Sequence, residues 1–186
     1  MSTALRFTLD EYDRMIEQGV FDDRPEEKME LVYGEIRTMS PPGPAHEDVI
    51  DLLARWSFES TLRDEVRIRV QNSIGIPELD SAPQPDVAWV REQSYRAGRP
   101  QSSDVLLLIE VSDSSLPDDR TTKAELYAEA GVSDYWIINL QDWCIEVYRN
   151  PANGRFQEKQ THHTGETLSP LALSDVKLEI AFLFAS

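Results

Sequence analysis

Five consecutive apolar residues, Val105 to Ile109, lead directly into the acidic residue Glu110. A strand that is apolar at every position is typical of a sheet covered on both faces, because a half-exposed strand alternates apolar with polar residues. We therefore expect this strand at the centre of a sheet. A carboxylate at its end is costly to bury unless something holds it, so Glu110 is the first candidate functional residue.

The segments around this strand alternate between helical and extended patterns. A capping box formed by Thr8 and Glu11 predicts the start of a first helix. Further helices are expected over Glu47 to Leu62 and Asp119 to Ala130. The expected strands, hairpins and loops are Lys28 to Thr38 with a turn at Tyr33-Gly34, a rigid loop at Ser40 to Pro44, Val66 to Ile76, Asp86 to Val90, Tyr135 to Leu140, Cys144 to Arg149 and Arg155 to Lys159. This order predicts one α/β (α+β) domain over residues 1–186, in which helices flank a mixed central sheet with extra β-hairpins.

The charge balance argues against a nonspecific polyanion binder. Lys and Arg number 18 and Asp and Glu 34, which gives a net charge of −16 and a pI near 4.5. Two arginine groups soften this objection to a nucleic-acid substrate: Arg63, Arg67 and Arg69, then Arg91, Arg96 and Arg99. Alternatively, these arginines are solvated or pair with the surplus acids. We expect weak, salt-sensitive binding or a small, specialised nucleic-acid substrate.

The single cysteine, Cys144, excludes an intramolecular disulfide, and no cluster of Cys and His predicts a thiolate zinc site. A reducing, cytoplasmic compartment fits this cysteine usage best. The segment Met1 to Asp10 has no export-signal pattern, and no apolar run is long enough to span a bilayer, so no membrane association is expected.

Asp86 begins an apolar strand just after a proline, so its carboxylate is expected to meet that of Glu110 on the sheet. Two converging carboxylates are what a hard divalent cation requires. The alternative is that each acid caps a strand or pairs with an arginine.

Lys123 lies on the apolar stripe of the third expected helix, because Leu126, Tyr127 and Ala130 follow it at i+3, i+4 and i+7. Asp119, at i−4, lies on the same stripe. A lysine directed at a sheet that carries two acids either neutralises them or works with them. The alternative is a lysine that reaches past the edge of the core to solvent.

Several ordered segments together resemble the Uma-type family of restriction endonucleases, which belongs to the PD-(D/E)XK nuclease superfamily. The segments are Glu30-Leu31-Val32-Tyr33-Gly34-Glu35, Met39-Ser40-Pro41 with His46, Pro85-Asp86, Glu110-Val111-Ser112, Asp119 and Lys123 before Tyr127, and Gly131-Val132-Ser133-Asp134-Tyr135-Trp136. The resemblance covers about Glu30 to Arg149. It departs from the superfamily pattern at Ser112, where a lysine normally stands two residues after the acid. The resemblance implies that Lys123 takes that lysine's place.

The resemblance implies a restriction endonuclease-like fold and hydrolysis of phosphodiester bonds with Mg²⁺ or Mn²⁺, with nucleic acid, most naturally DNA, as the substrate. It implies that Asp86 and Glu110 ligate the metal, together with the carbonyl of Val111. Lys123 then orients the attacking water or helps to deprotonate it. Glu30, His46 and Asp119 are possible accessory residues.

Each accessory residue also has a structural interpretation. Glu30 is equally well explained as a strand-end carboxylate paired with an arginine, and His46 as an exposed histidine at a helix start. Gln71 is taken as a half-exposed strand residue. His162 and His163 receive no role, and Cys144 is most simply a packed apolar residue.

Two other function classes compete with the nuclease. One is a noncatalytic module that binds nucleic acid or protein on the same fold, and the other is an assembly protein. A homodimer is expected in any case, because several apolar residues of the last hairpin and the C-terminal segment are predicted to stay available for self-association: Trp143, Tyr148, Phe156 and Ile180 to Phe184.

Overall fold

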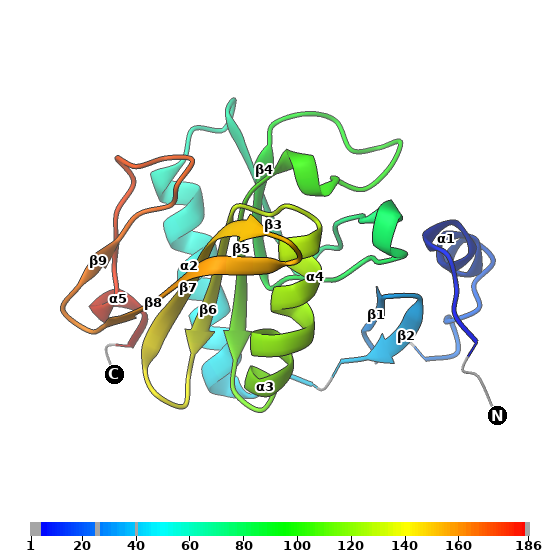
Figure 1. Ribbon diagram of the computed structural model, residues 1–186, viewed down its shortest axis with the longest axis horizontal. Helices are drawn as coiled ribbons and strands as arrows, with labels where there is room; N and C mark the ends of the chain where they lie inside the picture. Colours follow the sequence, from blue (N-terminus) through cyan, green and yellow to red (C-terminus); the bar gives the residue numbers. More distant parts are fainter. Residues whose placement is uncertain (1–4, 25–26, 40, 185–186) are drawn as a thin grey trace.

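The computed structural model describes residues 5–24, 27–39 and 41–184, and a six-stranded sheet lies at its centre (Figure 1). The spatial order of the strands is β3-β4-β5-β6-β7-β8. Within this sheet β5 and β6 are parallel, and the other neighbours are antiparallel. The bounds are β3 Val66–Val70, β4 Val87–Arg91, β5 Val105–Ser112, β6 Asp134–Asn139, β7 Cys144–Ala152 and β8 Arg155–His163. The expected mixed central sheet is confirmed.

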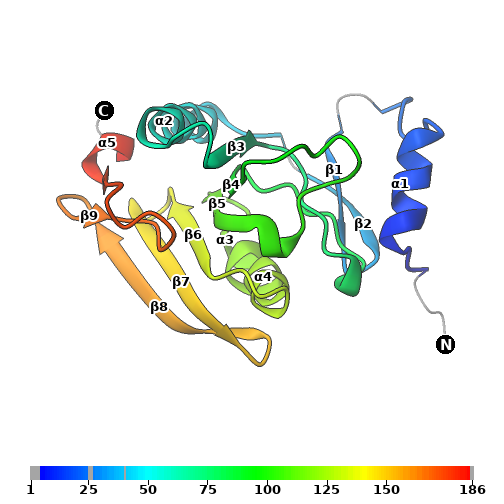
Figure 2. The same ribbon diagram turned by 90° about the horizontal axis from the view of Figure 1, so that it is seen from above.

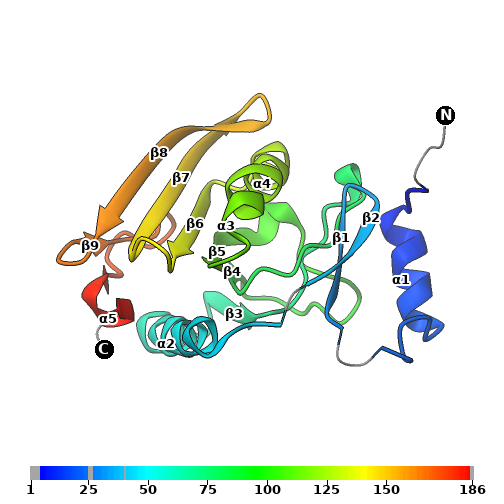
Figure 3. The ribbon, with the colours of Figure 1, turned by 90° about the horizontal axis from the view of Figure 1, so that it is seen from below.

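Helices cover both faces of the sheet, as Figure 2 and Figure 3 show from opposite sides. Helix α2, Pro44–Ser60, packs on one face. The other face carries a continuous helical segment made of α3 (Leu116–Asp118), the π-helical turn η3 (Asp119–Lys123) and α4 (Ala124–Glu129). The arrangement confirms the expected layers of helix, sheet and helix.

The first five residues of strand β5, Val105 to Ile109, are all apolar because both faces of the strand are covered. Leu107 and Ile109 belong to the core cluster beneath α2, whereas Leu108 belongs to the cluster on the α4 side. Successive side chains of a strand point to opposite faces, so Glu110 shares the α4 face with Leu108. The alternation of β5 therefore turns its one acid toward the helix that carries Lys123.

A small N-terminal unit of α1 (Leu9–Glu17), β1 (Met29–Val32) and β2 (Glu35–Thr38) lies beside the sheet (Figure 1). The predicted capping box is present, since the Thr8 hydroxyl accepts the Glu11 N–H and the Glu11 carboxylate accepts the Thr8 N–H. The predicted β1–β2 turn is also present, with Tyr33 and Gly34 at left-handed φ values of 50° and 76°.

The expected strand from Val66 to Ile76 is wrong beyond Val70. Gln71 has a φ of 51°, a left-handed conformation that turns the chain out of the sheet. Ile74 and Ile76 are buried, and their backbone groups form hydrogen bonds with residues 81–83, which lie outside the sheet. Their alternation therefore reflects burial under a loop.

Other boundaries shift for local reasons. Helix α2 starts earlier than expected because Pro44 suits the first helical position, and the third helix starts at Leu116 with Pro117 in its first turn. The last hairpin is longer than expected and turns at Asn153-Gly154, where both φ values are positive. Ser40 of the expected rigid loop and residues 1–4 of the N-terminal segment lie outside the described residues.

The remaining elements are short: η1 Pro77–Leu79, η2 Ser102–Asp104, β9 Thr167–Leu168, β10 Leu178–Glu179 and α5 Ala181–Phe184. Among the helices of the described residues, none combines the length and the apolarity that a membrane crossing requires.

Three of the residues expected at a dimer interface, Tyr148, Ile180 and Leu183, are buried. Tyr148 and Phe156 pack on Tyr135, and Ile180 is fully buried. Trp143 alone of the expected hairpin aromatics is largely exposed, at 54%. The premise of a free apolar surface is thus wrong for Tyr148 and Ile180, because Tyr148 belongs to the core cluster on the α4 side of the sheet and Ile180 to the cluster on the α2 side. Self-association itself stays a prediction, which light scattering at micromolar concentration tests.

Candidate active site

Asp86 and Glu110 meet at the junction of β4 and β5. Val87 pairs with Ile109, so the antiparallel register brings the two acids opposite each other. The Asp86 N–H donates to Glu110 Oε2 at 3.2 Å, and the Val111 N–H donates to Asp86 Oδ2 at 2.8 Å. Both side chains are buried. Each acid therefore accepts a backbone N–H from the neighbouring segment, and within the described part of the chain neither pairs with an arginine.

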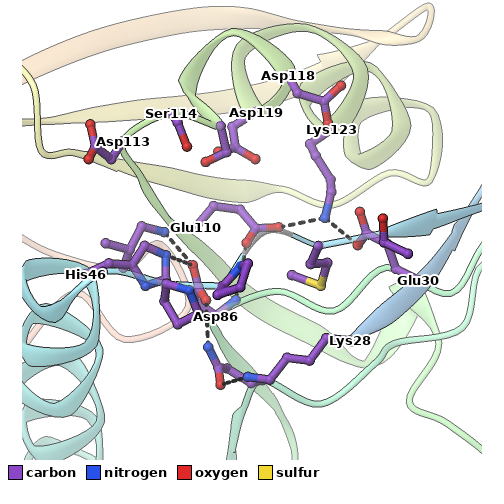
Figure 4. Close-up of a pocket in the computed structure, with 18 of the residues that line it drawn as sticks. Lys28, Glu30, His46, Asp86, Glu110, Asp113, Ser114, Asp118, Asp119 and Lys123 are labelled. Atoms are coloured by element: carbon purple, nitrogen blue, oxygen red, sulfur yellow. Dashed lines mark hydrogen bonds and ion pairs between the residues drawn. The ribbon is translucent and has the colours of Figure 1, made fainter. Parts of the chain in front are cut away.

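Lys123 points from the π-turn η3 into the same place (Figure 4). Its ammonium lies 2.7 Å from Glu30 Oε2 and 3.4 Å from Glu110 Oε1. It is buried, so the alternative of a lysine reaching solvent is wrong. The helical stripe read from the sequence gave its direction correctly.

Glu30 comes from β1 in the N-terminal unit. Besides Lys123, its carboxylate accepts the Gln84 N–H at 3.2 Å. The alternative of an arginine partner is thus wrong, because the cation that pairs with Glu30 is Lys123 of the facing helical segment.

His46 is held near Asp86 by the first turn of α2. Its Nε2 lies 3.4 Å from Asp86 Oδ2, and its side chain is only 19% exposed, so the alternative of an exposed helix-start histidine is wrong. Burial alone lowers the pKa of His46, but the neighbouring Asp86 carboxylate outweighs it and the pKa is raised.

Two residues that the sequence reasoning set aside or overlooked hold the acids. Gln71 donates from Nε2 to Asp86 Oδ1 at 3.2 Å, and the Tyr127 hydroxyl donates to Glu110 Oε1 at 2.7 Å. The inward direction of Tyr127 could have been predicted from the sequence, since it follows Lys123 at i+4 on the same apolar stripe. The contact of Gln71 could not have been predicted, because only the left-handed turn after β3 directs its side chain to Asp86.

Asp119 lies one turn of helix before Lys123 and is also buried in the cavity wall. The Ser112 hydroxyl donates to Asp119 Oδ2 at 2.7 Å. Burial raises the pKa of Asp119. Ser112, at the superfamily's usual lysine position, therefore supports an acid instead of supplying a cation.

The pKa values of Glu110 and Lys123 are both raised, but for different reasons. The pKa of Glu110 is raised to about 8: burial raises it most, Lys123 offsets part of the rise, and the charges of Asp119 and Asp86 contribute to it. Burial alone lowers the pKa of Lys123, but the carboxylates of Glu110 and Glu30 reverse this and raise it. Lys123 is therefore an ammonium ion at neutral pH.

These side chains line a cavity of about 580 Å³. Its charged lining residues are Lys28, Glu30, Arg37, Asp86, Glu110, Asp113, Asp118, Asp119 and Lys123. The backbone of Val111 and the start of α2 complete the wall, and His162 and His163 are not among the lining residues. The cavity thus gathers all seven candidate site residues proposed from the sequence.

Comparison with known proteins identifies the family. The sequence profile of the Uma2 family, described as "Putative restriction endonuclease", matches residues 9–181. The chain belongs to the Uma2 family. A search of curated proteins finds no match.

A solved structure shares the Uma2 fold seen here. It is titled a crystal structure of a putative nuclease belonging to DUF820 from Anabaena variabilis ATCC 29413. The TM-score is 0.73 at 18% identity, over 96% of this chain and 98% of the other. At that identity the likeness shows the fold alone.

Restriction endonuclease-like families generally use divalent metals, which need oxygen donors with free acceptor positions. Within the described ranges, no group of three or more His, Cys, Asp or Glu side chains is arranged to hold a metal. Mg²⁺, however, often binds through only one or two carboxylates, with waters and substrate phosphate completing its shell. Asp86 and Glu110 each have about four acceptor positions and three protein contacts, which leaves one position on each. The donor set of Asp86 and Glu110 in this chain therefore fits Mg²⁺.

Proposed function

We propose that this Uma2 protein is a metal-dependent nuclease that hydrolyses phosphodiester bonds of nucleic acid, with DNA as the expected substrate and Mg²⁺ or Mn²⁺ as the metal. The observation that supports this most is the meeting of Asp86, Glu110 and Lys123, from three separate segments, in one cavity. A purely structural core has no use for two buried acids and a buried lysine, since burying them is costly.

In this proposal Asp86, Glu110 and the Val111 carbonyl hold the metal. Mg²⁺ bound there supplies Lewis acidity, which activates water and stabilises the negative charge that develops on the phosphate. Gln71 and the Val111 N–H orient Asp86, and Tyr127 orients Glu110. These donors fix the two carboxylates before substrate arrives.

Lys123 acts as a cation in this proposal. Because its pKa is raised, it does not accept a proton at neutral pH; it orients the attacking water and offsets negative charge. Glu30 holds the lysine in place and is a positioning residue. His46 likewise positions Asp86 through its contact at 3.4 Å.

Nucleic acid must approach an acidic protein, which agrees with weak, salt-sensitive binding. Arg67 pairs with Glu92 and Arg99 with Asp13, so these two arginines are already partly neutralised. The first turn of α2, which lines the cavity, presents the positive end of the helix dipole to a phosphate.

The test is cleavage of supercoiled plasmid, single-stranded DNA and RNA by the purified protein with Mg²⁺, Mn²⁺ or chelator. We expect cleavage with metal that Asp86→Asn and Glu110→Gln abolish and that the exposed control Asp175→Asn retains. Cleavage that persists in Asp86→Asn points to a contaminant and contradicts the proposal. Binding without cleavage under every metal condition identifies the noncatalytic binding module instead.

A further inference from the structure

Lys28 is a cation at the cavity that the catalytic proposal does not use. It lies just before β1, lines the cavity and is exposed. Its ammonium donates to the side-chain oxygen of Gln71 at 2.5 Å. Among the described residues, no carboxylate lies within ion-pair distance of it. Lys28 therefore places a positive charge at the cavity with a neutral amide as its partner.

The two other cations of the cavity wall are already paired. Lys123 is bound between Glu30 and Glu110, and Arg37 lies 3.4 Å from Glu35 and 3.6 Å from Asp118. A phosphate that binds Arg37 must compete with two carboxylates. A phosphate that binds Lys28 displaces only the oxygen of an amide, and a hydrogen bond between two charged groups is stronger than the one it replaces.

Lys28 is also in the right place. Gln71 contacts Lys28 through its oxygen and Asp86 Oδ1 through its nitrogen, so a single amide group separates the ammonium from a proposed metal ligand. In Figure 4 the Lys28 side chain approaches Asp86 from below, whereas Lys123 approaches Glu110 from above. A nucleic-acid strand bound over the two acids would therefore have Lys28 on one side and Lys123 on the other.

We propose that Lys28 binds a backbone phosphate of the nucleic-acid substrate, beside the phosphate held over Asp86 and Glu110. This inference rests on the proposed nuclease function. The wall around the two acids is mostly negative, and phosphates are held mainly by Lys and Arg. Lys28 supplies the charge that this side of the cavity otherwise lacks, and its contact carries no base specificity.

The test measures how binding depends on salt. Each phosphate contact adds about 0.9 to the slope of log K against log salt for duplex DNA and about 0.7 for a single strand. We measure binding of a labelled oligonucleotide in chelator from about 50 to 200 mM salt. Lys28→Gln is expected to lower the slope by about that amount and to weaken binding roughly threefold to tenfold. Lys28→Arg keeps the slope, because it keeps the charge.

The matched control is Lys177→Gln, which removes the same charge from an exposed lysine that is not among the cavity-lining residues. It should keep the parent slope. In cleavage assays Lys28→Gln should raise KM and leave kcat nearly unchanged, as expected for lost uniform binding.

The outcomes separate this inference from the function on which it rests. If the parent binds nucleic acid and Lys28→Gln keeps its slope, Lys28 is not a phosphate contact although the nuclease proposal stands. If Lys28→Arg loses the slope as well, the effect runs through Gln71 and the inference fails. If the parent neither binds nor cleaves any nucleic acid, both proposals fall.

Discussion

The ammonium of Lys123 lies 2.7 Å from Glu30 Oε2, although the two residues are 93 positions apart in the chain. Both side chains are buried. The ion pair fastens the N-terminal hairpin to the helix beside the sheet, so one contact serves both the fold and the candidate site. Removing either partner leaves an uncompensated buried charge, which is far costlier than losing a surface pair.

Replacing Lys123 with methionine should therefore destabilise the protein as well as abolish cleavage. We expect a loss of about 3–5 kcal/mol in the free energy of unfolding near pH 8, measured by urea denaturation. Without the lysine, which lowers the pKa of Glu110, the folded-state pKa of Glu110 rises further above the unfolded value. Stability is then present at low pH and lost as pH rises, so the deficit should shrink near pH 5. Lys123→Arg, which keeps the charge, is the control, and an undiminished stability of Lys123→Met at pH 8 contradicts the ion-pair account.

Mg²⁺ should bind more tightly as pH rises. The pKa of Glu110 is about 8, so at lower pH the metal must displace a proton from this ligand. The rise in melting temperature caused by Mg²⁺ should therefore grow between about pH 6 and pH 9 in the parent protein. Asp86→Asn should abolish most of this rise. An equal rise in both proteins means that Mg²⁺ acts only by screening the net charge of −16.

Tyr127→Phe should weaken metal binding without unfolding the protein. The substitution removes the hydroxyl donor that lowers the pKa of Glu110, so this pKa rises further. We expect Mg²⁺ affinity, measured by calorimetry at pH 7, to fall about tenfold, and part of it to return at pH 9. The control is Tyr135→Phe, whose hydroxyl donates to the backbone carbonyl of Asp119. Similar losses in both variants indicate a general packing effect.

Glu146 should make the protein sensitive to acid. Burial alone raises its pKa, but hydrogen bonds from Arg120, Lys159 and Tyr148 lower it to about 2. A depressed pKa contributes stability above the unfolded value near 4.5 and loses it as pH falls toward 2. We expect the free energy of unfolding to fall by roughly 2–3 kcal/mol as the pH falls over this range.

The Glu146→Gln variant tests this account by chemical denaturation across the same pH range. It should start less stable at pH 7 and lose less on acidification, whereas the exposed control Glu179→Gln should follow the parent. Arg120 belongs to η3, the turn that carries Lys123, so Glu146→Gln should also reduce cleavage. If Glu146→Gln loses as much stability on acidification as the parent, the hydrogen bonds to Glu146 are not the cause of the acid sensitivity.

Local patterns in the sequence were sufficient for the direction of several site residues. The apolar run before Glu110 predicted a strand buried on both faces, and the helical stripe gave the inward direction of Lys123. These predictions hold because the side-chain periods of strands and helices are set by backbone geometry alone. The turn at Tyr33-Gly34 and the cap at Thr8 are similarly local.

The tertiary structure decided which residues meet. Glu30, His46 and Gln71 lie on three segments whose own patterns say nothing about Asp86, Glu110 or Lys123. Gln71 reaches Asp86 only because its left-handed φ ends β3, and Glu30 reaches Lys123 only because the N-terminal hairpin docks beside the sheet. The sequence by itself thus determined which faces β5 and the helical segment of Lys123 bury. The partners of the buried charges depended on long-range packing, because a charge in the core is stabilised by whichever donors the assembled fold brings within reach.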